Sequence, residues 1–138
     1  MLYIYPRTGT PGLPSPQDWD SIPGARGCTP QSCAFRDHHA ELQALGARVF
    51  GVSTQTTPQQ AEAAARLHLP FPLLSDMAGE LARALRLPTF RVEGEQDPLL
   101  RRVTLIITDG VIEKVVYPVF PPDQNAADVM DWLRQHES

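Results

Sequence analysis

The sequence has only two cysteines, Cys28 and Cys33, in 138 residues. A small secreted domain that depends on disulfides carries several pairs, so a disulfide framework is excluded. We expect the two cysteines to be catalytic, redox-active or simply buried. The chain also lacks the run of roughly 18 apolar residues that crosses a membrane, and its first residues lack a secretory leader pattern. We therefore expect a cytoplasmic protein that does not associate with membranes.

The sequence also lacks any cluster of like charges. Its 12 Lys and Arg residues against 16 Asp and Glu residues give a formal net charge of −4. Basic stripes bind nucleic acid and anionic lipid, so neither is expected as a partner. Apolar residues make up 42% of the chain and charged residues 20%, as in a globular protein with a buried core. The length predicts a single domain over residues 1–138.

Proline, by contrast, is abundant, with 14 residues in the chain. Five of these lie before residue 24, among several glycines, and indicate one long loop. Four other segments have the β-branched and apolar pattern of strands. They are residues 2–5, 49–53, 103–107 and 111–117. Asp109-Gly110 between the last two is a strong signal for a hairpin turn. Residues 69–74 are expected to be extended and residues 90–101 irregular.

Four helices are predicted from apolar faces and capping residues. They are bounded by Thr29 and Gly46, by Thr57 and His68, by Asp76 and Pro88, and by Asp123 near the end of the chain. Strands interleaved with helices in the first half imply parallel crossovers, while the final hairpin adds antiparallel strands. The sequence thus predicts an α/β fold, a thioredoxin-like sandwich with a mixed central sheet and helices on both faces.

Cys28 stands where the proline-rich loop gives way to the first predicted helix. Peptide N–H groups at a helix start are unpaired and lie at the positive end of the helix dipole, so both favour a thiolate. Cys28 is therefore predicted to be nucleophilic. The alternative is that both cysteines are small, buried hydrophobic residues.

The spacing of the two cysteines restricts their chemistry. If residues 28–33 were all helical, the two Cα atoms would lie about 8–9 Å apart. A disulfide tolerates only about 7 Å. The two sulfurs can therefore bond only if the first helical turn unwinds. This behaviour suits a two-step catalyst in which one cysteine is oxidised and the other resolves the product.

Two segments, YIYPRTGTPG at 3–12 and GCTPQSCAFRD at 27–37, resemble the active-site region of the peroxiredoxins, in particular the bacterioferritin-comigratory or Q-type branch. Later blocks resemble the same branch in the same order. These are GVST at 51–54, FPLLSD at 71–76 and RVTLII at 102–107. The resemblance covers nearly the whole chain.

The resemblance implies that Cys28 is the peroxidatic cysteine and Cys33 the resolving cysteine. Pro6 and Thr10 match the proline and threonine of the active-site loop, and Arg102 matches the arginine beside the thiolate. The implied activity is reduction of hydrogen peroxide and organic hydroperoxides through a sulfenic acid and an intramolecular disulfide. Thioredoxin or a similar dithiol protein would reduce that disulfide, with no cofactor and no metal.

The chain departs from the family pattern in two places. Fifteen extra residues, 13–27, separate the threonine motif from Cys28, and we expect them to loop out so that Pro6 and Thr10 keep their places. Alternatively, Arg26 and Thr29 take over part of the site. The chain also begins almost at its first strand, without the β-rich segment that precedes it in the family. We expect a monomer, with a homodimer through the exposed sheet edge as the alternative.

Two other functions compete with the peroxidase reading. A non-catalytic redox sensor or binding module on the same fold would result if the insertion displaced Thr10 from Cys28. A metal site could be imagined from the cysteines with His38 and His39. A helix turns once every 3.6 residues, so these side chains spread around its axis, and no metal is expected.

Overall fold

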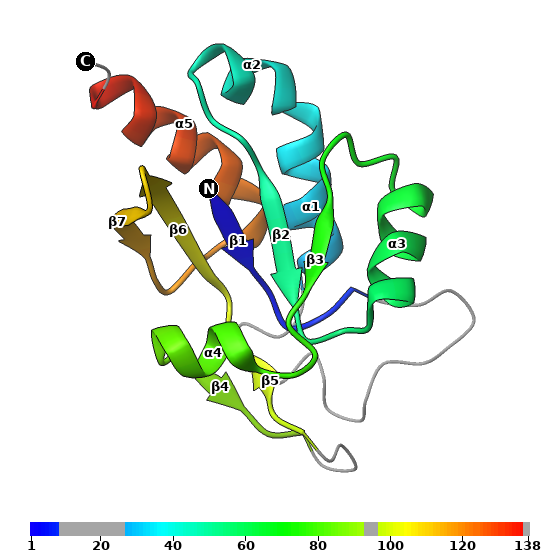
Figure 1. Cartoon of the computed structure of the whole chain (residues 1–138). Helices are drawn as coiled ribbons and strands as arrows, with labels where there is room; N and C mark the ends of the chain where they lie inside the picture. Colours follow the sequence, from blue (N-terminus) through cyan, green and yellow to red (C-terminus); the bar gives the residue numbers. More distant parts are fainter. Residues whose placement is uncertain (9–26, 93–96, 137–138) are drawn as a thin grey trace.

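The computed structural model describes residues 1–8, 27–92 and 97–136. Its main feature is a five-stranded mixed sheet in the order β3-β2-β1-β6-β7 (Figure 1). The strands are β1 (Leu2–Ile4), β2 (Phe50–Ser53), β3 (Leu73–Ser75), β6 (Val103–Thr108) and β7 (Val111–Val116). The first three are parallel, β6 is antiparallel to β1, and β7 is antiparallel to β6. The predicted mixed sheet is confirmed, and its edges are β3 and β7.

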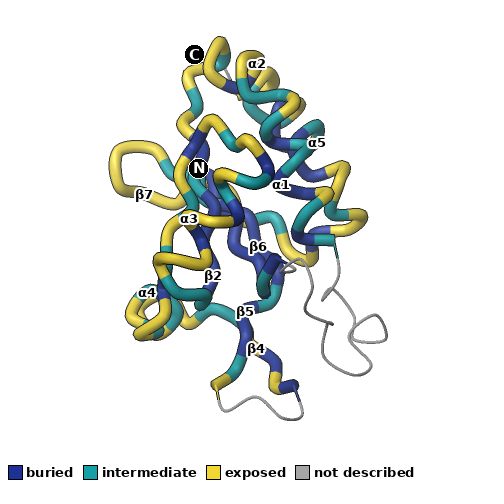
Figure 2. The backbone as a smooth tube through the Cα atoms, turned by 90° about the vertical axis from the view of Figure 1, so that its right-hand side faces the viewer, coloured by how far each residue is buried: buried dark blue, intermediate teal, exposed yellow. Residues whose placement is uncertain are grey.

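Helices lie on both faces of this sheet, as predicted. They are α1 (Cys28–Asp37), α2 (His39–Ala44), α3 (Thr57–Arg66), α4 (Glu80–Leu85), the 3-10 helix η2 (Pro122–Gln124) and α5 (Asn125–Gln135). Figure 2 shows α1, α2 and α5 on one side of the sheet and α4 on the other. None of the helices in the described ranges is long and apolar enough to cross a membrane.

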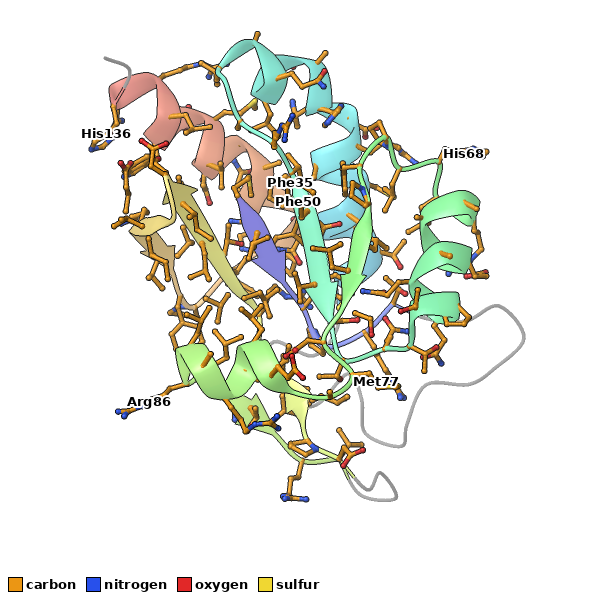
Figure 3. The ribbon with its side chains drawn as sticks, viewed as in Figure 1. Phe35, Phe50, His68, Met77, Arg86 and His136 are labelled. Atoms are coloured by element: carbon orange, nitrogen blue, oxygen red, sulfur yellow. The ribbon has the colours of Figure 1, made fainter. Side chains whose placement is uncertain are left out.

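The core divides into two layers because successive side chains of a strand point to opposite faces. Tyr3 of β1 and Tyr5, which follows β1, face α1 and α5, and the ring of Tyr3 stacks on Phe35 at a centroid distance of 4.6 Å. Phe35 lies between α1 and the sheet (Figure 3). Ile4 belongs to the opposite layer, where it packs with Val52 and with residues of α4.

The two buried tyrosines satisfy their hydroxyl groups through side chains of neighbouring helices. The hydroxyl of Tyr3 is 2.9 Å from Ser32 Oγ on α1. The hydroxyl of Tyr5 donates to Gln60 Oε1 on α3 at 2.9 Å. Gln60 in turn donates through Nε2 to the carbonyl of Leu74 at 2.8 Å. These bonds tie β1 and the residue that follows it to α1 and α3.

Two predicted helix starts are wrong by one or two residues. The first helix begins at Cys28 with Gly27, not Thr29, as its cap, and it breaks at His38 into α1 and α2. Helix α3 is capped by Thr56, not Thr57, and Gln59 completes the capping box. The one-residue shift leaves Gln60 free to turn inward to Tyr5, so a buried hydrogen bond fixes the register of the helix.

Two further helices begin some residues after the positions predicted for their caps. The carboxylate of Asp76 accepts hydrogen bonds from the N–H groups of Leu81 and Ala82, yet α4 begins only at Glu80. Helix α5 begins two residues after Asp123, behind η2. Asp76 therefore binds α4 from the approach to the helix, whereas the prediction that Asp123 caps the last helix is wrong, because Asp123 lies within η2 and Gln124 is the cap residue.

Short strands form in two segments whose strand pattern is weak. The extended segment 69–74 overlaps β3, which pairs with β2. The segment 90–101, predicted to be irregular, includes β5 (Leu99–Leu100) and the second residue of β4 (Thr89–Phe90), and these two strands pair with each other. Phe90 and Leu99 form a small apolar cluster that stabilises this pairing. The predicted hairpin turn is confirmed, since Asp109 and Gly110 have φ values of 51° and 80°.

The buried tyrosines predict that the protein loses stability at alkaline pH. Burial raises the pKa of both Tyr3 and Tyr5. The folded state therefore holds these protons more tightly than the unfolded state. Their stabilisation is complete below the ordinary tyrosine pKa of about 10 and falls by about 1.4 kcal/mol per pH unit for each tyrosine above it.

Urea unfolding between pH 8 and pH 11 checks this expectation. Tyr5→Phe lowers stability at pH 8, because Gln60 Oε1 loses the hydrogen bond from the tyrosine hydroxyl, but has a shallower alkaline decline than the wild type. Tyr117→Phe, a change at an exposed tyrosine, keeps the wild-type slope. Equal slopes for Tyr5→Phe and the wild type would contradict the assignment.

Candidate active site

Cys28 is the first residue of α1, and its position depends on the close packing of η2 against the start of this helix. Its neighbour Gly27 has φ 105°, a backbone conformation that residues with a side chain rarely adopt. A Cβ atom at Gly27 would lie 2.6 Å from Pro122 Cγ of η2. Glycine at this position therefore allows η2 to pack against the start of α1 and fixes where the helix begins.

A cation and a peptide N–H converge on the Cys28 sulfur. Arg102 Nη2 donates to Cys28 Sγ at 3.3 Å. The backbone N–H of Arg7, after β1, also hydrogen-bonds to the sulfur. Arg102 is only 3% exposed and Cys28 only 4%. The structure thus brings together two of the predicted site residues, Cys28 and Arg102, in a place that solvent hardly reaches.

The adjacent Arg101 points elsewhere, as expected for neighbours along an extended chain. Its Nε donates to the carbonyl of Thr89 at 3.2 Å. Its guanidinium carbon lies 5.5 Å from the centre of the Phe90 ring. The family resemblance matched Arg102 to the arginine beside the sulfur, and in the structure Arg102, not Arg101, donates to Cys28 Sγ.

Burial raises the pKa of the Cys28 thiol above its ordinary value. The charge and hydrogen bond of Arg102 act in the opposite direction, followed by the peptide N–H and charge of Arg7. The sequence argument predicted a lowered pKa from the helix start alone and could not weigh this burial. The arginine therefore supplies stabilisation of the thiolate that water would give to an exposed sulfur.

Three residues that the sequence analysis missed form a chain of hydrogen bonds behind Arg102. Arg102 Nη1 donates to Gln31 Oε1 at 2.6 Å. Gln31 Nε2 donates to Asn125 Oδ1 at 3.0 Å, and Thr104 Oγ1 donates to the same oxygen at 2.6 Å. Periodicity could have found two of them. Gln31 lies three residues after Cys28 on the same helix face, and Thr104 lies two residues after Arg102 on the same strand face.

The segment 5–8, which follows β1, is held by the turn that follows β2. Pro6 is fully buried. The backbone N–H of Thr8 donates to Gln55 Oε1 at 3.0 Å, and Gln55 Nε2 donates back to the carbonyl of Thr8 at 3.4 Å. Thr10, Arg26 and residues 13–26 of the predicted insertion lie outside the described residues.

Cys33 lies half-buried one and a half turns after Cys28, and both are free thiols. Helix α1 is continuous from Cys28 through Cys33. The condition set out from the sequence therefore applies, and a bond between the two sulfurs requires the start of α1 to unwind.

The two histidines near the cysteines lie at the far end of α1. His38 Nδ1 is 3.2 Å from Glu41 Oε1, and the ring of His39 packs against Phe71. Among the residues that the structure describes, no three His, Cys, Asp or Glu side chains are grouped to hold a metal ion.

Comparison with known proteins identifies the family. The family model described as Redoxin matches residues 1–130. Peroxiredoxin Bcp of Escherichia coli strain K12 is 31% identical over 143 residues, which cover 99% of this chain and 78% of the relative. The chain belongs to the peroxiredoxin family. The resemblance seen in the active-site segments therefore extends over nearly the whole sequence. Peroxiredoxins are thiol-dependent peroxidases.

Two further matches agree with this assignment. The chain is 26% identical to chloroplastic Peroxiredoxin Q of Arabidopsis thaliana, covering 97% of this chain but only 54% of that relative. The crystal structure of peroxidoxin BcpB from Mycobacterium tuberculosis matches with a TM-score of 0.75 and 29% identity, covering 99% of this chain and 79% of that one. The thioredoxin-like fold of this peroxiredoxin is therefore confirmed.

The packing of η2 against Gly27 predicts that this peroxiredoxin does not tolerate a side chain there. Gly27→Ala is expected to lower the free energy of unfolding by about 2–4 kcal/mol, since the strained φ and the contact with Pro122 both count against it. Gly46→Ala is the matched control, because Gly46 has φ 84° but open space around it. It should lose only about 1 kcal/mol. Equal losses in urea unfolding would refute the role of the Pro122 contact.

The contact between Arg102 and Cys28 predicts a pH dependence. Because the thiol pKa is raised, the rate of Cys28 alkylation should increase with pH from neutral into the alkaline range, as the thiolate fraction grows. Arg102→Leu should displace this profile to still higher pH. Iodoacetamide labelling of the Cys33→Ser protein measures it. Arg101→Leu is the control and should leave the profile in place, whereas an unshifted Arg102→Leu profile would contradict the electrostatic role.

Proposed function

We propose that this peroxiredoxin reduces hydrogen peroxide or organic hydroperoxides at Cys28. The observation that carries the proposal is the contact of 3.3 Å between Arg102 Nη2 and Cys28 Sγ at the start of α1. A thiolate is the form that attacks peroxides, and a fixed guanidinium stabilises it in a place where water does not.

In the first step, the Cys28 thiolate attacks one peroxide oxygen and the O–O bond breaks. Cys28 becomes a sulfenic acid, and the departing oxygen takes a proton and leaves as water or an alcohol. The N–H groups of Arg102 and the peptide N–H of Arg7 are placed to hold the peroxide and the negative charge that develops. Pro6 and Thr10 are proposed to shape the loop that covers the substrate.

In the second step, the Cys33 thiol condenses with the sulfenic acid, so that water leaves and a disulfide forms. The start of α1 must unwind for this step. Unwinding separates Gln31 from Arg102 and Ser32 from Tyr3, contacts that hold the folded turn. The oxidised protein therefore differs from the reduced one in the first two turns of α1.

The remaining features of the proposal follow from this chemistry. An external dithiol protein, most simply thioredoxin, reduces the disulfide, and neither a metal nor a cofactor takes part. We propose a monomer in the cytoplasm, with pairing through the β3 or β7 edge as the route to a homodimer. Nucleic acid and membranes are not proposed as partners.

A second candidate function is a slow redox sensor that forms the same disulfide without efficient turnover. Burial of Cys28, with its raised thiol pKa, favours this alternative because both reduce the thiolate available at neutral pH. The second-order rate of Cys28 oxidation separates the two. A peroxidase reacts orders of magnitude faster than a free thiol, and a sensor of this kind does not.

The roles of the two cysteines predict different losses on substitution. Cys28→Ser should abolish peroxide consumption in the presence of thioredoxin, thioredoxin reductase and NADPH. Cys33→Ser should still consume about one equivalent of peroxide but fail to turn over with thioredoxin, because no disulfide forms. Substantial turnover by Cys28→Ser would exclude Cys28 as the site of attack. Turnover by Cys33→Ser would exclude Cys33 as the resolving cysteine.

A further inference from the structure

Asn125 is the single asparagine of the chain and lies at the first position of α5, far in sequence from both cysteines. It is only 1% exposed. Its Oδ1 accepts two hydrogen bonds, from Gln31 Nε2 and from Thr104 Oγ1. Its Nδ2 has no hydrogen-bond partner among the described residues. An apolar side chain would avoid a buried, unsatisfied amide NH2 group, so the oxygen is the part of Asn125 that this position uses.

The bonds to Asn125 Oδ1 and to Arg102 together require one orientation of the Gln31 amide. An amide has a donating end and an accepting end, and Asn125 Oδ1 can only accept. Gln31 therefore turns its Nε2 toward Asn125 and its Oε1 toward Arg102, where it receives a bond of 2.6 Å. With the opposite orientation, Gln31 would present N–H groups to a guanidinium that has only donors.

Arg102 gains a fixed direction from this arrangement. One of its terminal nitrogens, Nη1, is held by Gln31, and the other, Nη2, reaches Cys28 Sγ at 3.3 Å. The guanidinium is planar and rigid, so fixing one nitrogen fixes the other. Thr104 supports the same oxygen of Asn125 from the sheet, and Gln31 and Thr104 are both fully buried.

We propose that Asn125, supported by Thr104, is a positioning residue that acts through Gln31 to aim Arg102 at the Cys28 sulfur. The importance of this role for catalysis rests on the proposed function. The orientation of the Arg102 guanidinium can be tested independently of it. The chain of bonds runs from α5 and β6 through α1 to the sulfur. It therefore makes the reactivity of Cys28 depend on the docking of the C-terminal helix.

The test measures the pH profile of Cys28 alkylation by iodoacetamide in the Cys33→Ser background, where Cys28 is the remaining thiol. Asn125→Leu replaces the amide with an apolar side chain of similar size. Without its anchor, Gln31 releases Arg102 and the thiolate loses stabilisation. We expect a profile displaced to higher pH and alkylation at pH 7 slower by roughly tenfold, the effect of one charge-assisted hydrogen bond.

Variants at Thr104 keep the test decisive if Asn125→Leu folds poorly. Thr104→Val removes only the hydroxyl and should shift the profile in the same direction by a smaller amount. Thr104→Ser keeps the hydroxyl and should return the profile toward that of the parent. Val129→Ala, in the buried face of the same helix, lowers stability without touching the network and should leave the profile unshifted.

Among the residues that the structure describes, the charged and titratable groups that act on Cys28 include Arg102 before β6, Arg7 and Tyr5 after β1, and Tyr3 on β1. None of them is changed in these variants, so a shift reports on their arrangement. Asn125→Leu and Thr104→Val profiles that coincide with that of the parent would overturn the inference. Peroxide reaction rates of the same proteins separate it from the proposed function. A shifted alkylation profile in a protein that does not reduce peroxide supports the positioning role and rejects the peroxidase.

Discussion

The contact between the Cys28 sulfur and the Arg102 guanidinium is the interaction on which the rest of the site depends. Both groups are buried, so solvent contributes little to stabilising a thiolate, and burial alone raises the thiol pKa. The arginine and the peptide N–H of Arg7 act against that effect. A buried cation with fixed direction can also aim its donors at an oxygen bound near the sulfur, which a mobile, hydrated cation cannot do. Reactivity at this site is therefore a matter of orientation as much as of charge.

The same helix that places Cys28 also restrains it. The start of α1 is held by Gln31 against Arg102, by Ser32 against Tyr3, and by η2 against Gly27. These contacts favour the folded turn, in which the two cysteines cannot bond. The proposed disulfide needs that turn to unwind, so the contacts that prepare Cys28 for attack also oppose the step that follows it. In the proposed mechanism, their combined strength sets how long oxidised Cys28 persists before it reacts with Cys33.

The sheet brings these contacts together from distant parts of the chain. Strand β1 supplies Tyr3 and leads to the Arg7 peptide, while the approach to β6 supplies Arg102 and β6 itself Thr104. Because β1 and β6 are adjacent and antiparallel, the residue after the end of β1 and the residue before β6 lie near each other at one end of the sheet. Helix α1 and the start of α5 pack over this end and close the network.

The sequence by itself determined the fold class and the family, and it singled out Cys28, Cys33 and Arg102 as candidate site residues, because these inferences depend on local periodicity and on short motifs within continuous segments. It also identified the Asp109-Gly110 turn, whose backbone conformation follows from residue type. Only the tertiary structure decided that Gln31, Thr104 and Asn125 meet behind Arg102, since they come from three elements with no common motif. It alone decided the cap at Gly27, the register that turns Gln60 inward, and the β4–β5 pair, each set by a contact with a residue far along the chain. Burial of Cys28 likewise needs the whole fold, and so the sign of its pKa shift could not be read from the helix start.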